Sequence, residues 1–456
     1  MNLETLAATL RGAHLKKPNM DIKARIKKLE LLKEEILKKE NEISEALKID
    51  LGKSAFETYT TEIGFILEEI SLSVKKLNEW ASIKKVKTPL SLFPGKSSIH
   101  PEPYGVVLII SPWNYPFQLC LSPFVGAIAA GNRVVIKPSE FAVETAKIIE
   151  SIVSAVFTED DVAVVQGGLE ESQILLKQRF DYIFFTGSTA VGKVIMQAAS
   201  EFLTPVTLEL GGKSPCLIED SANIDIAAKR IVWGKYLNAG QTCVAPDYIL
   251  VPKKLQDELI SKIGEYITTF YGKDVEASED YSRIINNRHF DRLQDLVIGS
   301  KVAFGGEVKR EDNFMGPTIM KDVEWTDKVM QDEIFGPILP IIPYDNLDEA
   351  INGIMNYPKP LAFYVFSEDS SKQKDIISRV PFGGGCINDT VIHLANPNLP
   401  FGGVGTSGIG SYHGKKSFDT FTHYKSLYQQ GTLVDIPLRY PPYNEKKLSW
   451  IKLFLR

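Results

Sequence analysis

One cysteine of this chain lies in a segment that suits covalent chemistry. Cys243 ends the run Asn-Ala-Gly-Gln-Thr-Cys at positions 238–243, which is small, polar and follows a helical pattern. Reactive thiolates are found in polar, partly exposed surroundings rather than in apolar cores. Cys120, Cys216 and Cys386 have apolar or strand-like neighbours and are expected to be inert thiols. Cys243 is therefore the candidate nucleophile.

Glu209 and Asn114 could assist such a nucleophile. Glu209 lies inside the apolar run Val-Thr-Leu-Glu-Leu, where an unpaired carboxylate is costly to bury. It suits a general base that faces water, or the ribose-binding acid that follows a glycine motif by about 20 residues, and spacing leaves both open. Asn114 follows a buried strand and could donate to a developing oxyanion, although an asparagine in a Pro-rich turn is by default a turn residue.

Two glycine-rich runs could approach a dinucleotide. Gly403–Gly408 spells G-x-G-x-x-G, but no strand precedes it, so we expect a flexible loop there. The run that begins Gly187-Ser188 and ends at Gly192 lacks the middle glycine, yet it follows an apolar strand and opens a helix. Helix N-termini attract phosphate through unpaired N–H groups, so the second run is the better candidate, although glycine there can be turn chemistry alone.

A lysine and a carboxylate follow another predicted strand. Lys137 ends the run Val-Val-Ile-Lys, and Glu140 comes three residues later. Ligands of open α/β sheets bind beyond the carboxyl ends of the strands, so the two side chains could hold ribose hydroxyls. An ordinary surface ion pair is an equally good interpretation.

Strands and helices alternate through most of the chain, which predicts an α/β fold with parallel sheets. Residues 21–80 show helical periodicity after a plausible Asp21 cap, and we interpret their many charges as a solvated amphipathic face. Residues 83–103 lack helical periodicity and could form an extended arm. The predicted strands are 105–110, 133–137, 162–166, 181–186, 215–218, 248–251, 361–366 and 386–388.

Composition excludes several classes of protein. The chain has 456 residues, which suits two or three domains, and its net charge of -5 disfavours nucleic-acid binding. The first fifty residues carry charges throughout, and we expect neither a signal peptide nor a transmembrane helix. The cysteines and histidines show no metal-ligand spacing, so we expect no metal and a reducing, cytoplasmic setting.

Together these segments resemble the aldehyde dehydrogenase superfamily, in the family's order and over most of the chain. The C-terminal run from Pro400 to Phe421 and the short N-terminus resemble the class 3 branch, which includes fatty and aromatic aldehyde dehydrogenases. The matching runs are Pro-Trp-Asn-Tyr-Pro at 112–116, Lys-Pro-Ser-Glu at 137–140, Phe-Thr-Gly-Ser-Thr-Ala-Val-Gly at 185–192, Leu-Glu-Leu-Gly-Gly-Lys at 208–213, Gly-Gln-Thr-Cys at 240–243 and Glu-Ile-Phe-Gly-Pro at 333–337.

The resemblance implies a role for each matching residue. Cys243 would be the nucleophile, Glu209 the base for a hydrolytic water and Asn114 an oxyanion donor. The cofactor would be NAD or NADP, and the substrate a medium or long aliphatic or an aromatic aldehyde. A CoA- or phosphate-dependent acylating enzyme and a non-catalytic protein with the same fold are the alternatives. The residues expected near the cofactor are Lys137, Glu140, Gly187, Ser188, Gly192, Leu210, Glu333 and Phe335.

The resemblance also implies a Rossmann-like cofactor domain, an α/β catalytic domain and a small oligomerisation arm that joins a homodimer. The basic and apolar C-terminal tail is too short to span a bilayer; packing on its own dimer is the simpler interpretation, and contact with a membrane surface is the alternative. The expected boundaries are 1–82 and 104–207 for the cofactor domain, 208–410 for the catalytic domain, 83–103 and 411–435 for the arm, and 436–456 for the tail.

Overall fold

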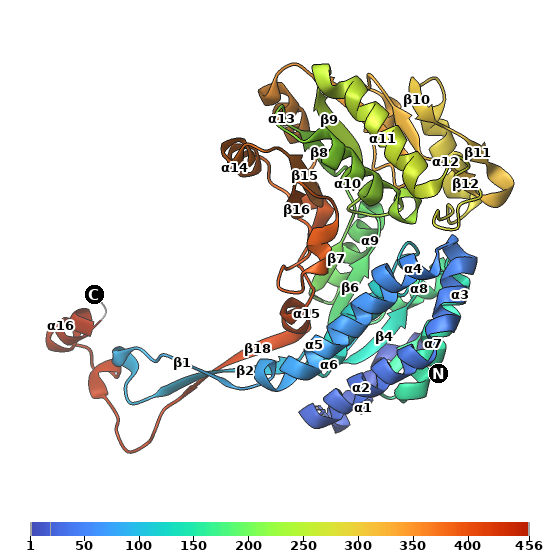
Figure 1. Cartoon of the computed structure of the whole chain (residues 1–456). Helices are drawn as coiled ribbons and strands as arrows, with labels where there is room; N and C mark the ends of the chain where they lie inside the picture. Colours follow the sequence, from blue (N-terminus) through green and yellow to red (C-terminus); the bar gives the residue numbers. More distant parts are fainter. Residues whose placement is uncertain (1, 19, 455–456) are drawn as a thin grey trace.

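Two β-sheets form the centres of the two lobes in Figure 1. The computed structural model describes residues 2–18 and 20–454. In the first sheet, of six strands, only the edge strand β17 runs antiparallel to its neighbour. In spatial order its strands are β17 (Gly408–Ile409), β7 (Val206–Glu209), β6 (Tyr182–Thr186), β3 (Val106–Ile110), β4 (Arg133–Lys137) and β5 (Val162–Val164).

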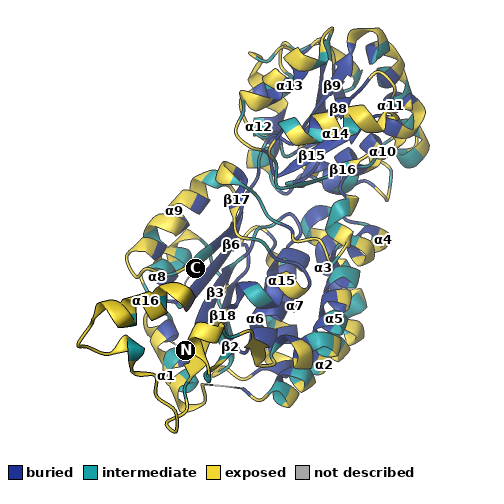
Figure 2. Ribbon diagram, turned by 90° about the vertical axis from the view of Figure 1, so that its left-hand side faces the viewer, coloured by how far each residue is buried: buried dark blue, intermediate teal, exposed yellow. Residues whose placement is uncertain are grey.

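Helices cover both faces of this sheet, as its almost wholly buried strands require. In Figure 2 the first group of helices lies on one side of the sheet and the second group on the other. The first group is α1 (Leu6–Lys16), α8 (Leu169–Leu176) and α9 (Thr189–Ser200). The second is α6 (Gln118–Ala130) and α7 (Val143–Val156), on which α2 (Ile22–Lys38), α3 (Glu40–Leu51) and α5 (Gly64–Trp80) pack.

The order of the strands reverses between β3 and β6. From β3 the chain passes to β4 and β5 on one side, then returns to place β6 and β7 on the other. Connections that leave neighbouring strands in opposite directions open a crevice at the strands' carboxyl ends. Two segments border this crevice: Ser111–Asn114, which follows β3, and Gly187–Ser188, which follows β6.

The second sheet has seven strands, all parallel except at the β10 edge. Helices α10 (Ile224–Tyr236), α11 (Gln256–Tyr271), α13 (Leu347–Met355) and α14 (Ser370–Arg379) belong to this lobe. Cys243 lies in the loop between α10 and β9. The strands, in spatial order, are β10 (Val302–Gly305), β13 (Thr318–Met320), β14 (Ile338–Tyr344), β9 (Tyr248–Pro252), β8 (Pro215–Ile218), β15 (Ala362–Phe366) and β16 (Gly384–Ile387).

A three-stranded sheet forms an arm that extends away from both lobes (Figure 1). Strand β2 (Lys96–Pro103) pairs with β1 (Lys84–Val86) on one edge and with β18 (Thr422–Gln429) on the other, in each case antiparallel. The tail ends in α16 (Glu445–Phe454) beyond the arm. No helix within residues 2–18 and 20–454 is long and apolar enough to cross a membrane.

The α/β fold predicted from the sequence is confirmed, and most predicted strands lie within two residues of the observed ones. Strands β13 and β14 escaped prediction, and β14 did so because it contains Pro340 and Pro343, which argue against a central strand. The predicted domain boundary at 207 falls inside β7. Asp21 occupies the N-cap of α2, but its side chain makes no capping hydrogen bond.

Two predictions about local structure are wrong. The loop at Gly403–Gly408 is not free: it contains a short 3-10 helix and β17, and the Ser407 carbonyl accepts a hydrogen bond from Leu210 N at 3.1 Å. The charges of residues 21–80 are not all solvated either. Several are buried where the N-terminal helices contact other parts of the chain, namely Arg25, Lys53, Glu57, Glu62 and Glu69.

Candidate active site

A cavity of about 530 Å³ lies where the crevice of the first sheet meets the Cys243 loop. It brings together eight of the eleven residues singled out from the sequence. Lys137, Glu140 and Gly192 do not line it. The eight are Asn114, Gly187, Ser188, Glu209, Leu210, Cys243, Glu333 and Phe335.

A tightly wound turn presents Cys243 to this cavity. Asn238, Ala239 and Gly240 are three consecutive residues with left-handed backbone, at φ 52°, 51° and 75°. A Cβ at Gly240 would lie 2.3 Å from the Gly336 carbonyl oxygen, so only glycine allows the two chain segments to approach. The turn directs the chain from the end of α10 into the cavity, where Cys243 is partly buried.

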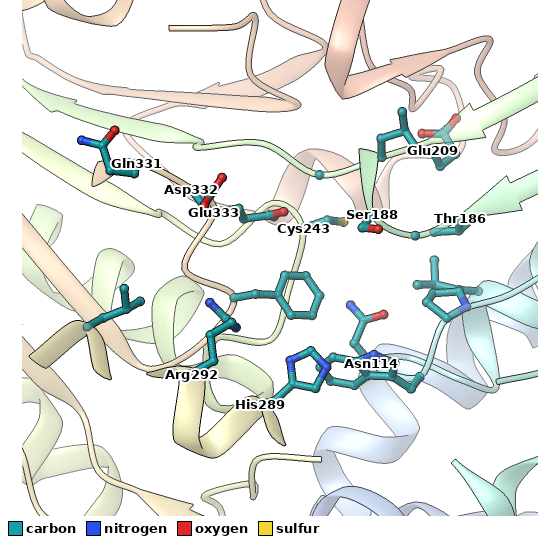
Figure 3. Close-up of a pocket in the computed structure, with 18 of the residues that line it drawn as sticks. Asn114, Thr186, Ser188, Glu209, Cys243, His289, Arg292, Gln331, Asp332 and Glu333 are labelled. Carbon is teal, nitrogen blue, oxygen red and sulfur yellow. The ribbon is translucent and has the colours of Figure 1, made fainter. Parts of the chain in front are cut away.

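Asn114 is held directly beside this turn. Its Nδ2 donates to the Gln241 carbonyl oxygen at 3.0 Å, and its own carbonyl accepts from Asn238 Nδ2 at 2.7 Å and from Lys53 Nζ at 3.1 Å. A primary amide has two N–H bonds, so one remains for an oxygen atom in the cavity. Figure 3 shows the amide directed toward Cys243.

The Cys243 thiol is in a setting that opposes its ionisation. Burial is the main cause that raises the pKa of this thiol, and the neighbouring carboxyl groups of Glu333 and Glu209 add to the effect. The backbone N–H groups of Cys243 and Val244 act in the opposite direction. A positive charge brought into the cavity would favour the thiolate by the same electrostatic rule.

Glu209 and Glu333 lie on opposite sides of Cys243 in Figure 3. Burial raises the pKa of Glu209 well above its ordinary value, and neither carboxyl oxygen has a hydrogen-bond partner in the part of the chain described. Burial, followed by the charge of Asp247, raises the pKa of Glu333 to about 8. Burial therefore disfavours the ionised form of both carboxyl groups in this cavity.

The turn after β6 has the features of a phosphate site. Gly187 N donates to the Glu209 carbonyl at 3.0 Å, which joins the ends of β6 and β7. Ser188 caps α9 by accepting from Val191 N at 3.4 Å, so the helix begins at the wall of the cavity. A Cβ at Gly192 would lie 2.6 Å from Leu210 Cδ2. Glycine at that position thus lets α9 pack closely on the chain that follows β7.

Lys137 and Glu140 lie at the end of β4, next to the cavity but outside its lining. Lys137 Nζ donates to the carbonyls of Pro138 at 2.9 Å and Gly167 at 2.6 Å, and lies 3.9 Å from the Glu140 carboxylate. Burial lowers the pKa of Lys137, whereas the Glu140 side chain is 41% exposed. The pair is thus a fixed amine beside a solvent-facing carboxylate.

Sequence reasoning missed an aromatic wall of the cavity. The Trp113 ring lies 5.3 Å from the Phe335 ring and 4.9 Å from the His289 ring, measured between centroids. Phe335 has a left-handed backbone conformation, with φ 51°, and this conformation sets the direction of its ring. Burial lowers the pKa of His289 to about 4, which leaves this ring uncharged. Trp113 could have been found from its place beside Asn114, but nothing around His289 in the sequence marks it.

A parallel sheet with a helix N-terminus at its reversal point, and a cysteine facing that point, define a dinucleotide-dependent dehydrogenase. The model of the aldehyde dehydrogenase family matches residues 4–427. The chain belongs to this family, as the motifs predicted. It is an enzyme that oxidises aldehydes to carboxylic acids with NAD or NADP.

Two relatives and one solved structure show how close the similarity is. The chain is 50% identical to 4,4'-diaponeurosporen-aldehyde dehydrogenase of Staphylococcus aureus over 96% of this chain and 95% of that protein. It is 49% identical to mouse aldehyde dehydrogenase family 3 member A2, over 99% and 94%, which confirms the class 3 resemblance. A structure described as the substrate-bound state of Staphylococcus aureus AldH matches with a TM-score of 0.98 and 48% identity, over 100% of both chains.

The surroundings of Cys243 predict how fast it reacts at different pH. Because its pKa is raised, alkylation by iodoacetamide without nucleotide should accelerate with pH and not level off below about pH 9. Glu333→Gln should react faster than the wild type only above pH 8, where the native carboxyl becomes negative and opposes the thiolate. Peptide mass spectrometry would measure alkylation at Cys243 alone.

The exposed Glu324 of the same lobe provides the matched control. Glu324→Gln should follow the wild-type curve at every pH. A plateau of the wild-type rate near neutral pH, or equal rates for Glu333→Gln and wild type in alkaline buffer, would contradict this electrostatic account.

Proposed function

We propose that the cavity oxidises aldehydes through a covalent intermediate on Cys243, with Asn114 as oxyanion donor and Glu209 as the base. One observation carries the proposal: a thiol, an amide fixed beside it and a carboxyl group without partners line a single cavity. The same cavity reaches the turn at the start of α9. The proposed nucleophile, oxyanion donor and base therefore all line the same cavity.

The first step is addition of the Cys243 thiolate to the aldehyde carbon. The carbon–sulfur bond forms as the carbonyl π bond breaks, and the negative charge moves to the oxygen. The free N–H of Asn114 and the backbone N–H of Cys243 donate to this oxyanion. A single fixed donor of this kind typically contributes about 3 kcal/mol to the stability of the transition state.

The residues around the cavity fit NAD or NADP. The buried Thr186 Oγ1 has no partner within the described residues and lines the cavity, as an orphaned polar atom beside a ligand would. A bound nucleotide would supply the oxidant, an acceptor for the hydride (two electrons and the former aldehyde hydrogen) of the adduct, whose loss would leave a thioester on Cys243. The residues that would hold it are Lys137 and Glu140 at a ribose, Gly187, Ser188 and Gly192 at the phosphates, Leu210, and Glu333 with Phe335 at the nicotinamide end.

The second step is hydrolysis of the thioester. The Glu209 carboxylate takes a proton from water, the resulting hydroxide adds to the acyl carbon, and collapse of the adduct releases the acid and the Cys243 thiolate. Because burial raises the pKa of Glu209, the fraction of its active, ionised form increases with pH. Turnover limited by this step should therefore rise toward alkaline pH.

Two variants test these roles. Cys243→Ala should abolish formation of reduced nucleotide, because no acyl carrier remains. Glu209→Gln should still give one equivalent of reduced nucleotide in a burst, followed by turnover slower by roughly 10²–10⁴-fold, the usual worth of a general base. Stopped-flow absorbance of the reduced nicotinamide measures both phases, and acid-quench mass spectrometry detects the acyl group on Cys243.

Glu324→Gln again provides the control, with unchanged burst and turnover. An unchanged steady-state rate for Glu209→Gln would remove its assignment as the base. Turnover that requires added CoA or phosphate would indicate an acylating enzyme instead.

We propose medium or long aliphatic and aromatic aldehydes as substrates. The name of one relative specifies a diaponeurosporen-aldehyde, which supports this class. Trp113, Leu119 and Phe335 give the cavity apolar walls. Each buried methylene contributes about 0.8 kcal/mol, so kcat/KM should rise up to about fourfold per methylene along a series of straight-chain aldehydes. Steady-state kinetics with propanal to dodecanal, and with benzaldehyde, would measure this. A flat or falling series would contradict the assignment.

We propose that the arm joins two copies of the chain, and that the domain boundaries are those expected from the motifs except that the boundary at 207 moves to the end of β7. The pairing of β2 and β18 extends over eight residue pairs, yet the arm carries large exposed apolar side chains with no lobe to cover them. Burial of such side chains against a second copy is the simplest way to remove them from water. They include Leu90, Leu92, Phe93, Leu427 and Tyr428.

Leu427→Asp should therefore weaken the dimer, because it places a charge in the proposed contact. Leu203→Asp is the matched control: Leu203 is as apolar and even more exposed, but it lies on the first lobe and not on the arm. Sedimentation velocity over a range of concentrations should show a monomer for Leu427→Asp under conditions where wild type and Leu203→Asp are dimers. A monomeric wild type, or a dimeric Leu427→Asp, would overturn the proposal.

The tail helix α16 is basic and apolar, with Leu448, Trp450 and Leu453 exposed. We propose that it packs on the dimer, and contact with a membrane surface is the alternative. We also propose a cytoplasmic location, because all four cysteines are free thiols and a reducing compartment preserves them.

A further inference from the structure

A buried ion pair lies directly behind the cavity, on the N-terminal helices. Lys53, just after α3, and Glu62, in the π-helical turn that precedes α5, have fully buried side chains and are in direct contact. Removing two charges from water costs several kcal/mol per ion unless further hydrogen bonds satisfy them. The other contacts of the two side chains therefore show what the pair holds in place.

Glu62 holds the start of α6. Its Oε2 accepts hydrogen bonds from Phe117 N at 2.9 Å and Gln118 N at 3.0 Å, the first amides of the helix that follows the Asn114 loop. A carboxylate at a helix N-terminus is favoured by the unpaired N–H groups and by the helix dipole. The end of the loop is thereby fixed to the N-terminal helices.

Lys53 holds the loop itself. Its Nζ donates to the Asn114 carbonyl oxygen at 3.1 Å and lies 4.0 Å from the centre of the Tyr115 ring. The Tyr115 hydroxyl is 2.6 Å from Thr242 Oγ1, and Thr242 precedes Cys243. The Lys53 ammonium group therefore contacts both Asn114 and Tyr115. Tyr115 in turn contacts Thr242, the residue next to Cys243.

We propose that Lys53 and Glu62 are positioning residues for the reaction: they fix the Asn114 amide and the Cys243 turn relative to each other. The inference rests on the proposed role of Asn114 as oxyanion donor. Neither side chain lines the cavity, so neither touches the substrate. Lys53 acts on the loop through the Asn114 carbonyl and the Tyr115 ring. Glu62 acts on it through the backbone N–H groups of Phe117 and Gln118.

The position of the charges explains why apolar residues would not serve equally well. The Asn114 carbonyl and the Phe117 and Gln118 amides are buried polar groups, and each needs a partner in a fixed direction. Lys53 offers donors and Glu62 offers acceptors, and their mutual attraction holds both in one geometry. A second carboxyl group, Glu57, also lies near Lys53, so the ammonium group is surrounded by acidic and carbonyl oxygens.

The double variant Lys53→Met/Glu62→Gln tests the proposal. Either single substitution leaves one buried charge uncompensated and is expected to lower the melting temperature, whereas the double variant removes both charges together. In the double variant we expect a smaller loss of melting temperature than in either single variant, but a burst of reduced nucleotide slower by about 10- to 100-fold, since a displacement of about 1 Å can cost that much. The KM values for aldehyde and nucleotide should stay within about twofold, because uniform binding is untouched.

Arg25→Met is the structural control. Arg25 is also a buried cation, and it donates to the Ala129 and Ala130 carbonyls at the opposite end of α6. This variant should lose thermal stability and keep the wild-type burst rate in the enzyme that remains folded. The positioning role would be overturned by a double variant with the wild-type burst rate, or by an Arg25→Met enzyme whose burst slows as much as that of the double variant.

Asn114→Ala separates this inference from the proposed function beneath it. If Asn114→Ala leaves the burst rate unchanged, the oxyanion assignment itself fails. If Asn114→Ala slows the burst and the Lys53/Glu62 double variant does not, only the positioning inference fails. We expect Asn114→Ala and the Lys53/Glu62 double variant each to slow the burst. Combining all three substitutions should slow it little further, because the residues act through one another.

Discussion

The hydrogen bond from Asn114 Nδ2 to the Gln241 carbonyl joins the two halves of the active site. Asn114 comes from the loop after β3 of the first sheet, and Gln241 comes from the turn before β9 of the second sheet. Neither sheet alone contains both the amide and the thiol. Two hydrogen bonds join the loops: Asn114 Nδ2 donates to the Gln241 carbonyl, and Asn238 Nδ2 donates to the Asn114 carbonyl. The distance between Asn114 and Cys243 therefore depends on the backbone geometry of the two loops.

Exclusion of water explains most of the electrostatics of the cavity. Burial is the main cause of the raised pKa of Cys243, Glu209 and Glu333, and the two carboxyl groups also oppose ionisation of the Cys243 thiol. A positive charge brought into such a cavity would lower the pKa of each of these groups.

Periodicity in the sequence sufficed for strands β3, β4, β5 and β6 of the first sheet, because parallel strands covered on both faces are continuous apolar runs, as in Val106–Ile110 and Arg133–Lys137. It failed for β14, whose prolines resemble those of a loop. Motif context favoured the glycine run whose Gly187 and Ser188 line the cavity, since Gly187–Gly192 follows a strand and Gly403–Gly408 does not. Spacing could not decide what Glu209 does, because its neighbours in space come from other parts of the chain.

The buried charges of the N-terminal helices show where local reasoning stops. Lys53 and Glu62 occur among many lysines and glutamates that do face solvent, and helical periodicity assigns all of them to one polar surface. Their burial arises from the loop between β3 and α6, whose carbonyl and N–H groups need charged partners. Instead of pairing within a strand or helix, these backbone groups form hydrogen bonds with the charged side chains of Lys53 and Glu62, which come from a distant segment. Helical periodicity alone therefore could not show that these two charged residues contact the loop that bears Asn114 and the start of α6.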